Sequence, residues 1–299
     1  MFLLALSAGA QPVRDRWMAG LPDSLKACRV SIPGTHDSGT YGVKFPMRHY
    51  ARTQTMDISE QWDAGIRFFD LRPRLDGGEL KIYHGPASCH LTLADALSIL
   101  MRKIEDNPTE FCIVMTNSAG GGQAAVDGTM ELIRSVIPSG MLADFKADMR
   151  VADIRGRILF MHRNAPSTGV DAPGAVILGW PGNGSSRRVR LQSSVGPGAE
   201  LWEQDYFTSG SNNADAYLQG KWDSMYRLLQ AFSDADGVWC INHASGYTGT
   251  GVRTNIGKNT RNTNARLLDW LNENRLPVGI IPMDFPSQEL IDAIIECNR

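Results

Sequence analysis

The sequence predicts an α/β protein whose mainly parallel sheet closes into a barrel. Short apolar segments alternate with helical segments along much of the chain, which is the pattern of βαβ units. About eight strand segments fit into the 299 residues, which suits a (β/α)8 barrel. Helices are missing between some of these segments. We therefore expect a distorted, single-domain TIM barrel.

Each predicted strand is a short apolar run bounded by turn-forming residues. Side chains alternate across a strand, so Phe68, Asp70 and Arg72 share one face of the second segment. The predicted strands cover 29–32, 65–72, 80–84, 111–116, 157–163, 175–178, 238–242 and 278–282, with a further short one at 200–205.

The clearest predicted helix covers 92–106. Its apolar residues recur at helical spacing, Thr92 is a suitable N-cap, and Pro108 lies beyond its end. The remaining predicted helices cover 58–64, 124–137, 214–233, 262–274 and 287–297.

The segment 165–211 is rich in Gly, Pro and Ser, and we interpret it as long loops. Strand segments continue after it, so it does not separate two domains, and we expect 11–299 to form one catalytic domain. Residues 1–10 resemble the end of a secretory signal peptide, because a short apolar stretch leads to an Ala-x-Ala site, although the basic n-region is missing. The alternative is an apolar tail. We expect a secreted, extracellular protein.

The charge balance excludes some classes of partner. The net charge of −2 provides no basic excess to neutralise nucleic-acid phosphates or to hold the chain on an anionic membrane. The five cysteines contain no Cys-x-x-Cys pair, which argues against a zinc site. Cys112 and Cys240 lie in apolar strand-like runs and are expected to be buried hydrophobic residues.

Five predicted strands end in a side chain that can transfer protons or bind anions, and these are His36, Arg72, His84, Arg163 and Asp284. In a barrel the carboxyl ends of the strands meet at one mouth, where active sites lie. A lone histidine at a strand end is more often a satisfied hydrogen-bonding group, and a lone Arg or Asp is usually a solvated cap. Five together indicate an active site.

The residue types indicate phosphodiester cleavage. A histidine pair can supply base and acid near neutral pH. An arginine presents a fixed fork of donors to phosphate oxygens, and a carboxylate beside the base stabilises its imidazolium form. With an internal hydroxyl as nucleophile, this set requires no metal ion.

Four segments resemble a known family. SIPGTHDSGTY, GIRFFDLRPRL, YHGP and DNPTEFCIVM occur in the order found in the X region of bacterial phosphatidylinositol-specific phospholipase C, and RWMAGLPDSL before them is also similar to that family. The resemblance extends from about Trp17 to the final helix and is weaker in the second half. It implies a distorted TIM barrel that cleaves phosphatidylinositol, and possible action on glycosylphosphatidylinositol anchors.

The resemblance also implies catalytic roles. His36 would be the general base that takes the proton of the inositol 2-hydroxyl, and Asp284 would be its partner. His84 would be the general acid that protonates the diacylglycerol oxygen. Arg72 would bind the phosphate, and Asp37 would support His84 and Arg72.

The resemblance implies an inositol-binding set as well. Arg163 and Asp205 would hold the ring hydroxyls, and either Tyr206 or Phe207 would stack under the ring. The family often has a lysine shortly after strand 4, where this chain has Ser118 or Asn117, so one contact to the ring is expected to be weaker.

The family often has exposed tryptophans on its membrane-binding rim, whereas the matching loops KFPMRHYAR and ASGYTGTGV contain none. Phe45, Met47, Tyr50 and Tyr247 are candidates for contact with the lipid surface, with packed loop residues as the alternative. We expect transient binding to a membrane that contains phosphatidylinositol, and a monomeric enzyme.

We expect neither a metal ion nor another cofactor. Calcium takes six to eight oxygen ligands, but a guanidinium, that of Arg72, occupies the expected phosphate position. Asp70 is expected to pair with Arg72 or Arg74. Among the other histidines, His243 ends a strand and is a weaker candidate for a substrate contact.

Two other functions remain as alternatives. A metal-dependent glycerophosphodiesterase could use the same barrel, but it needs a Glu-x-Asp cluster after the second strand, where this chain has FFDLRPRL. A non-catalytic phosphoinositide- or glycan-binding module would be favoured by the loss of a histidine or of Arg72, and all are present.

Overall fold

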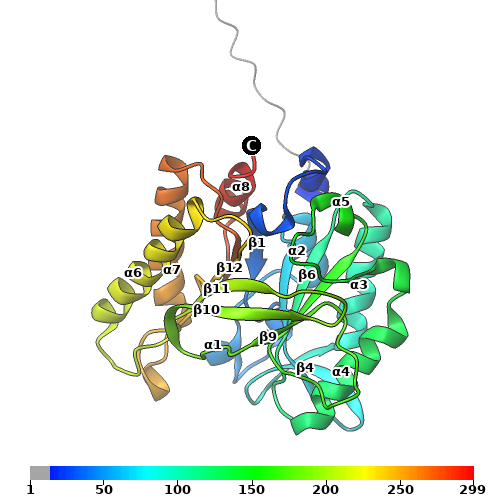
Figure 1. The fold of residues 1–299 in the computed structure, drawn as a ribbon. Coiled ribbons are helices and arrows are strands. Elements are labelled where there is room, and N and C mark those ends of the chain that lie inside the picture. The colour runs from blue at the N-terminus through cyan, green and yellow to red at the C-terminus, as the bar shows by residue number, and fades with distance from the viewer. Residues whose placement is uncertain (1–13) are drawn as a thin grey trace, which may run out of the picture.

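The computed structural model describes residues 14–299 and arranges them around one closed sheet (Figure 1). In sheet order, its ten strands are β6 (Cys112–Thr116), β2 (Phe68–Leu71), β1 (Ile32–Thr35), β13 (Ile280–Met283), β12 (Trp239–Asn242), β11 (Ala199–Asp205), β10 (Gly184–Ser193), β9 (Ala175–Leu178), β8 (Ile158–His162) and β7 (Leu142–Ala143). Because β6 also pairs with β8, the nine strands other than β7 close into a barrel. The predicted distorted TIM barrel is confirmed, with one strand more than eight.

The distortion lies on one side of the barrel. Strand β10 runs antiparallel to both β9 and β11, whereas the other pairs of the closed sheet are parallel. No helix separates β8, β9, β10 and β11 along the chain, so these strands connect through loops alone. The sequence predicted that some strands would lack a connecting helix, and these are the strands that lack one.

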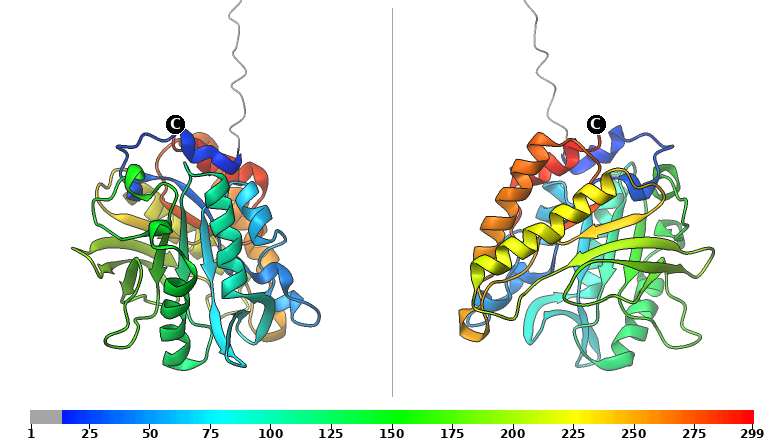
Figure 2. Two further views of the ribbon diagram at one scale, coloured as in Figure 1. Left: turned by 90° about the vertical axis from the view of Figure 1, so that its right-hand side faces the viewer. Right: turned by 60° about the vertical axis from the view of Figure 1, so that its left-hand side comes forward.

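The helices cover the outside of the sheet (Figure 2). They are α1 (Arg48–Ala51), α2 (Ile58–Asp63), α3 (Leu93–Asp106), α4 (Gly122–Val136), α5 (Val151–Ile154), α6 (Ala214–Ser233), α7 (Ile256–Glu273) and α8 (Gln288–Glu296). Short 3-10 helices occupy Arg14–Gly20, Ala27–Arg29, Thr40–Gly42, Ser139–Met141 and Gly251–Arg253. The predicted cap forms, since Thr92 accepts a hydrogen bond from the first turn of α3, and Ser287 caps α8 in the same way. None of the described helices is both long enough and apolar enough to cross a membrane.

The predicted strand at 80–84 exists but lies outside the barrel. It is β4 (Glu79–His84), the central strand of a separate antiparallel sheet with β3 (Pro73–Asp76) and β5 (Ala87–Thr92). Gly77 and Gly78, both with positive φ, form the tight turn between β3 and β4. The turn sends the chain back along itself after β2, so His84 reaches the barrel mouth from a hairpin.

Strand β10 contradicts the interpretation of 165–211 as loops. Its outward side chains include Arg188 and Arg190, which face solvent, and among its described side chains Leu191 alone is buried. A half-exposed antiparallel strand needs no continuous apolar run. The sequence of this segment therefore resembles that of a polar loop.

Strand β1 begins three residues later than predicted and includes Pro33 and Gly34. A Cβ atom on Gly34 would lie 2.8 Å from Cδ1 of Phe68, so glycine allows β1 and β2 to approach closely. The Pro-Gly pair is therefore part of the strand, and His36 follows at its carboxyl end.

The core lies between the barrel and its helices and includes all five cysteines, which are buried and free. One buried ion pair interrupts it at the amino-terminal end of the strands. Arg67, just before β2, lies 2.9 Å from Glu110, and both side chains are fully buried.

Candidate active site

A cavity of about 470 Å³ opens at the carboxyl ends of the barrel strands. Its lining combines cations, carboxylates, histidines and aromatic side chains. The lining residues are His36, Tyr50, Thr53, Arg72, His84, Asn117, Arg163, Asp205, Phe207, Gly246, Tyr247, Thr254, Ile256 and Asp284. The five strand-end residues that the sequence predicted are all among them.

His36 and Asp284 form the predicted pair. His36 follows β1, Asp284 follows β13, and His36 Nδ1 lies 2.8 Å from Asp284 Oδ1. Because a carboxylate only accepts, Nδ1 carries the proton. The backbone N–H of Gly246 donates to the other Asp284 oxygen at 3.1 Å, which fixes the carboxylate.

The second nitrogen of His36 faces the cavity. Arg72 Nη2 lies 2.7 Å from His36 Nε2, and arginine can only donate. Nε2 therefore carries no proton, and its lone pair accepts this hydrogen bond until a substrate hydroxyl replaces the guanidinium. Burial lowers the pKa of His36, but Asp37 and Asp284 outweigh burial and raise it above its ordinary value of 6.5. The ring is thus built to accept and stabilise a proton.

Two carboxylates hold the Arg72 guanidinium. Arg72 Nε lies 2.8 Å from Asp37 Oδ1, and Arg72 Nη2 donates to Asp70 Oδ2 at 3.0 Å. Burial raises the pKa of Asp70, but Arg72 more than reverses this, so Asp70 is ionised. The guanidinium is therefore a fixed cation beside His36, and of the two expected partners of Asp70 it is Arg72 that pairs with it.

His84 lies across the site from His36, with ring centroids 6.2 Å apart. Its Nδ1 donates to the carbonyl oxygen of Ala51 at 2.7 Å, so Nε2 faces the cavity side. Nε2 lies 3.5 Å from Asp37 Oδ2, which supports the predicted contact between Asp37 and His84.

Asp37 has more neighbours than predicted. Its Oδ2 lies 3.3 Å from His36 Nε2 as well as 3.5 Å from His84 Nε2. It has a positive φ of 47°, and its side chain is almost fully buried. The sequence hypothesis that Asp37 serves only the His84 side is too narrow, since the carboxylate lies between both histidines.

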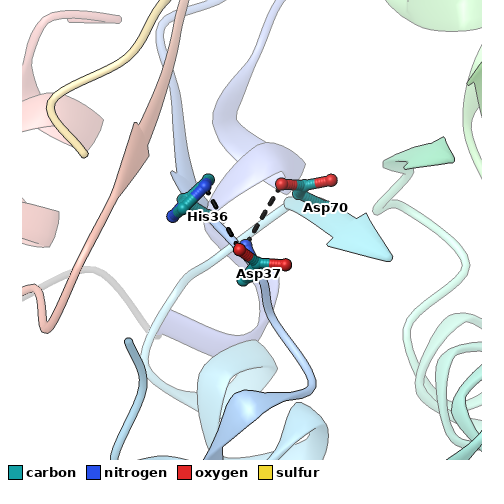
Figure 3. A group of neighbouring side chains, drawn as sticks. All are labelled: His36, Asp37 and Asp70. Carbon is teal, nitrogen blue, oxygen red and sulfur yellow. Dashed lines mark hydrogen bonds and ion pairs between the residues drawn. The ribbon is translucent and has the colours of Figure 1, made fainter. Parts of the chain in front are cut away.

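His36, Asp37 and Asp70 form a compact group of potential metal ligands, with ligand atoms within 4.8 Å of one another (Figure 3). The donor set does not fit a resident cation well. Both carboxylates already neutralise Arg72, and His36 Nε2 accepts from the same guanidinium. A metal ion here would have to displace the Arg72 guanidinium from both carboxylates.

Arg163 and Asp205 lie together on the other side of the cavity. Arg163 follows β8, Asp205 ends β11, and Arg163 Nη1 lies 3.8 Å from Asp205 Oδ2. Trp180 holds both, because its Nε1 donates to Asp205 at 3.2 Å and its ring lies under the guanidinium at 4.1 Å. The pair is thus fixed in place, with polar atoms at the cavity wall.

The structure distinguishes the members of two residue pairs that the sequence left open, Tyr206 or Phe207 and Ser118 or Asn117. Phe207 lines the cavity and packs against Tyr247, whereas Tyr206 packs against Tyr217 outside it. After β6, Asn117 lines the cavity. The Ser118 hydroxyl bonds to the backbone of Gly120, so this residue is not brought into the site.

A second polar layer lies below the cavity; sequence reasoning missed two of its members, Glu203 and Lys221, and named the third, His243, only as a weaker candidate for a substrate contact. Glu203, Lys221 and His243 are fully buried there. Burial is the main cause that raises the pKa of Glu203 to about 8 and lowers that of Lys221 to about 8. Lys221 could have been noticed, because it occupies an apolar-face position of the helix 214–233. His243 supports the site from below and is not a lining residue.

The chain was compared with known proteins. No protein-family model matches it. It is 26% identical over 293 residues to the 1-phosphatidylinositol phosphodiesterase of Listeria monocytogenes, which covers 95% of this chain and 85% of that protein. It is 30% identical over 121 residues to the enzyme of the same name from Staphylococcus aureus, where the match spans 40% of this chain and 39% of that protein.

Solved structures share the fold across the whole chain. The phosphatidylinositol-specific phospholipase C of L. monocytogenes superimposes with a TM-score of 0.77 at 23% identity, covering 96% of this chain and 99% of that one. The S. aureus enzyme gives a TM-score of 0.80 at 19% identity, covering 97% and 99%. By sequence and by fold, the chain is thus similar over nearly its whole length to bacterial phosphatidylinositol-specific phospholipases C.

Proposed function

We propose that this protein cleaves phosphatidylinositol to diacylglycerol and inositol 1,2-cyclic phosphate by general acid–base catalysis. One observation carries the proposal. Two histidines, each held through Nδ1, turn their Nε2 atoms toward a site that contains the Arg72 guanidinium and the Asp37 carboxylate. Cyclising cleavage of a phosphodiester needs such a base, acid and fixed cation.

The first half of the reaction forms the new ester bond. His36 Nε2 takes the proton of the inositol 2-hydroxyl, and the 2-oxygen attacks phosphorus with the electron pair that this releases. Asp284 stabilises the resulting imidazolium through Nδ1. Arg72 offsets the negative charge that grows on the phosphate oxygens.

The second half breaks the bond from phosphorus to the diacylglycerol oxygen. This oxygen leaves with the bonding electrons and takes a proton from His84 Nε2. The Asp37 carboxylate lies 3.5 Å from this nitrogen and faces the same side of the ring. One proton has passed from the 2-hydroxyl to the leaving oxygen by way of the two histidines. Water then opens the cyclic phosphate slowly, with the two roles exchanged.

Arg163 and Asp205 hold the inositol hydroxyls in this proposal, and Phe207 packs against the ring. The support is their shared wall of the cavity and the fixed geometry of the ion pair. Glycosylphosphatidylinositol anchors carry the same 2-hydroxyl and phosphodiester, so we include them as a second substrate class.

The proposal includes secretion and transient binding to membranes. Phe45 is 91% and Tyr50 41% exposed beside the cavity, which supports contact with a lipid surface, whereas Met47 and Tyr247 are half-buried. The N-terminal segment that favours secretion, residues 1–10, lies outside the described residues. The solved S. aureus relative is an enzyme whose membrane binding can be modulated.

Phosphorus NMR of phosphatidylinositol vesicles treated with the enzyme tests the proposal. We expect inositol 1,2-cyclic phosphate to appear first, at the same rate with and without a chelator. The variants His36→Ala and His84→Ala should each lose on the order of 10²–10⁴ in rate while remaining folded. Direct release of the acyclic phosphate, loss of activity in chelator with recovery in calcium, or a fully active histidine variant would each contradict it.

A further inference from the structure

A second cavity of about 460 Å³ adjoins the catalytic one. Ile256, at the start of α7, lines both cavities, and the single turn of α1 contributes Tyr50 to the first and Arg48 and His49 to the second. The second cavity is lined by Phe45, Pro46, Arg48, His49, Arg52, Thr55, Asn255, Ile256, Gly257 and Phe285. The catalytic mechanism uses none of its polar side chains.

The second cavity carries positive charge without compensation. Arg48 and Arg52 both line it, and none of its lining residues is acidic. Across the described chain, neither arginine forms an ion pair. Arg52 uses only its Nε, which donates to the carbonyl of Gln54 at 2.8 Å, and Arg48 has no side-chain hydrogen bond. The outer guanidinium nitrogens are therefore available to an anion.

The remaining walls are apolar. Phe45 is 91% exposed at this site, and Pro46, Ile256 and Phe285 complete the apolar surface. An inorganic anion would contact only the cations and leave these side chains unused. An anion attached to a glyceryl and acyl body would use both kinds of wall.

We propose that this cavity binds the phosphate of a second, uncleaved anionic phospholipid at the membrane surface. Phosphate is the anion that two arginines recognise best, through charge-assisted hydrogen bonds. The position suits this occupant, because the cavity that exposed Phe45 lines adjoins the catalytic cavity at Ile256. The inference goes beyond the proposed function, since the second lipid is bound and not cleaved.

Occupancy of this site would reach the catalytic residues through the backbone. Ala51, between Tyr50 and Arg52, accepts the Nδ1 hydrogen bond of His84 at 2.7 Å. Gln54 Nε2 donates to the carbonyl of His36 at 2.8 Å. A phosphate held by Arg48 and Arg52 would therefore order the segment that positions both histidines.

Calorimetric titration with dihexanoyl phosphatidylglycerol, kept below its micelle concentration, tests the proposal. Saturating myo-inositol occupies the catalytic cavity during the titration. We expect dihexanoyl phosphatidylglycerol still to bind in the presence of myo-inositol. Inorganic phosphate and dihexanoyl phosphatidylcholine should bind more weakly than this lipid. In the double variant Arg48→Gln/Arg52→Gln, the affinity for the lipid should fall at least about tenfold. The matched control is Arg102→Gln, an exposed arginine on α3, which should bind like the wild type.

Three results would overturn the proposal. They are unchanged affinity in the double variant, equal weakening in the Arg102 variant, and complete displacement by myo-inositol. If inorganic phosphate binds as tightly as the lipid, the site is a general anion site and the lipid assignment is wrong. If the double variant fails to fold by circular dichroism, Arg48→Gln alone decides, because this side chain makes no internal hydrogen bond and its loss should still weaken binding severalfold. The readout is binding, so it stands apart from any failure of the proposed cleavage.

Discussion

Asp37 shows how one side chain can join two halves of a site. Its carboxylate reaches His36, Arg72 and His84, and its left-handed backbone conformation turns the chain sharply after β1. Such strained positions persist where the surrounding structure holds them. Here Thr40 Oγ1 donates to the Asp37 carbonyl at 2.8 Å, and the backbone N–H of Asp37 donates to Asp70. The turn is thus secured from both sides.

At the same scale, the two carboxylates around His36 predict a pH dependence. The base works when neutral, so activity should fall as the pH decreases through the pKa of His36, which lies above 6.5. The acid limb of kcat/KM in the wild type should therefore lie above that pH. In Asp284→Asn this limb should move to lower pH, and kcat should fall about 10²–10⁴-fold because the ring loses its orienting acceptor.

The control for this measurement is Asp269→Asn, which changes an exposed carboxylate on α7. Its pH profile should match the wild type. An acid limb that does not move in Asp284→Asn would show that another group controls it.

At the scale of elements, the sequence predicts strands well where both faces are buried. The segments that became β2, β6, β8 and β12 are rich in apolar residues, and each was predicted as a strand. For β2 and β8 the strand-end residues Arg72 and Arg163 were predicted as well. Strand β10 was missed because half of its side chains face solvent. The β4 hairpin was placed in the barrel because strand membership depends on long-range pairing, which local pattern does not contain.

The active-site residues likewise fall into those that the sequence could predict and those that it could not. The residues at strand ends could be predicted because parallel strands bring their carboxyl ends together. Trp180 could not, because its importance depends on contacts with Arg163 and Asp205 that only the folded barrel creates. The Tyr206–Phe207 choice depended on strand alternation at the end of β11, where the pattern stops.

Arg67 links several elements at the end of the barrel opposite the site. It pairs with Glu110 at 2.9 Å and donates to the carbonyls of Trp62 and Asp15. Removal in Arg67→Ala would leave the Glu110 carboxyl buried without its partner. We expect a loss of about 3–5 kcal/mol in the free energy of unfolding, measured with urea.

Arg102→Ala removes an exposed arginine and should change the same free energy by less than about 0.5 kcal/mol. If Arg67→Ala costs no more than this control, the buried pair does not hold the elements together.

At the scale of the whole molecule, the mouth of the barrel carries both chemistry and exposed apolar surface. Helix α1, which contributes Tyr50 to the catalytic cavity, lies at the lower end of the molecule in Figure 1, and the 3-10 helix Arg14–Gly20 and the C-terminus lie at the upper end. A membrane could therefore approach the mouth without meeting either end of the described chain.

This arrangement predicts an effect of Phe45→Ser on membrane binding. Burying a phenylalanine side chain is worth about 1.5–3 kcal/mol, so affinity for phosphatidylcholine vesicles should fall at least about tenfold. Hydrolysis of soluble inositol 1,2-cyclic phosphate should be unaffected, since Phe45 does not line the catalytic cavity. The control is Leu178→Ser on β9, 39% exposed and away from either cavity. Binding is measured by sedimentation of the protein with the vesicles. If both variants sediment equally, the prediction that the barrel mouth faces the membrane is wrong.

The hydrogen bond between His36 and Asp284 joins residues 248 positions apart. During synthesis on the ribosome, His36, Arg72 and His84 emerge long before the strand that delivers Asp284. The base therefore acquires its orienting partner only when β13 inserts between β1 and β12 to complete the sheet. An unfinished or C-terminally clipped chain would lack a competent base. Catalytic activity would therefore report that the barrel has closed completely.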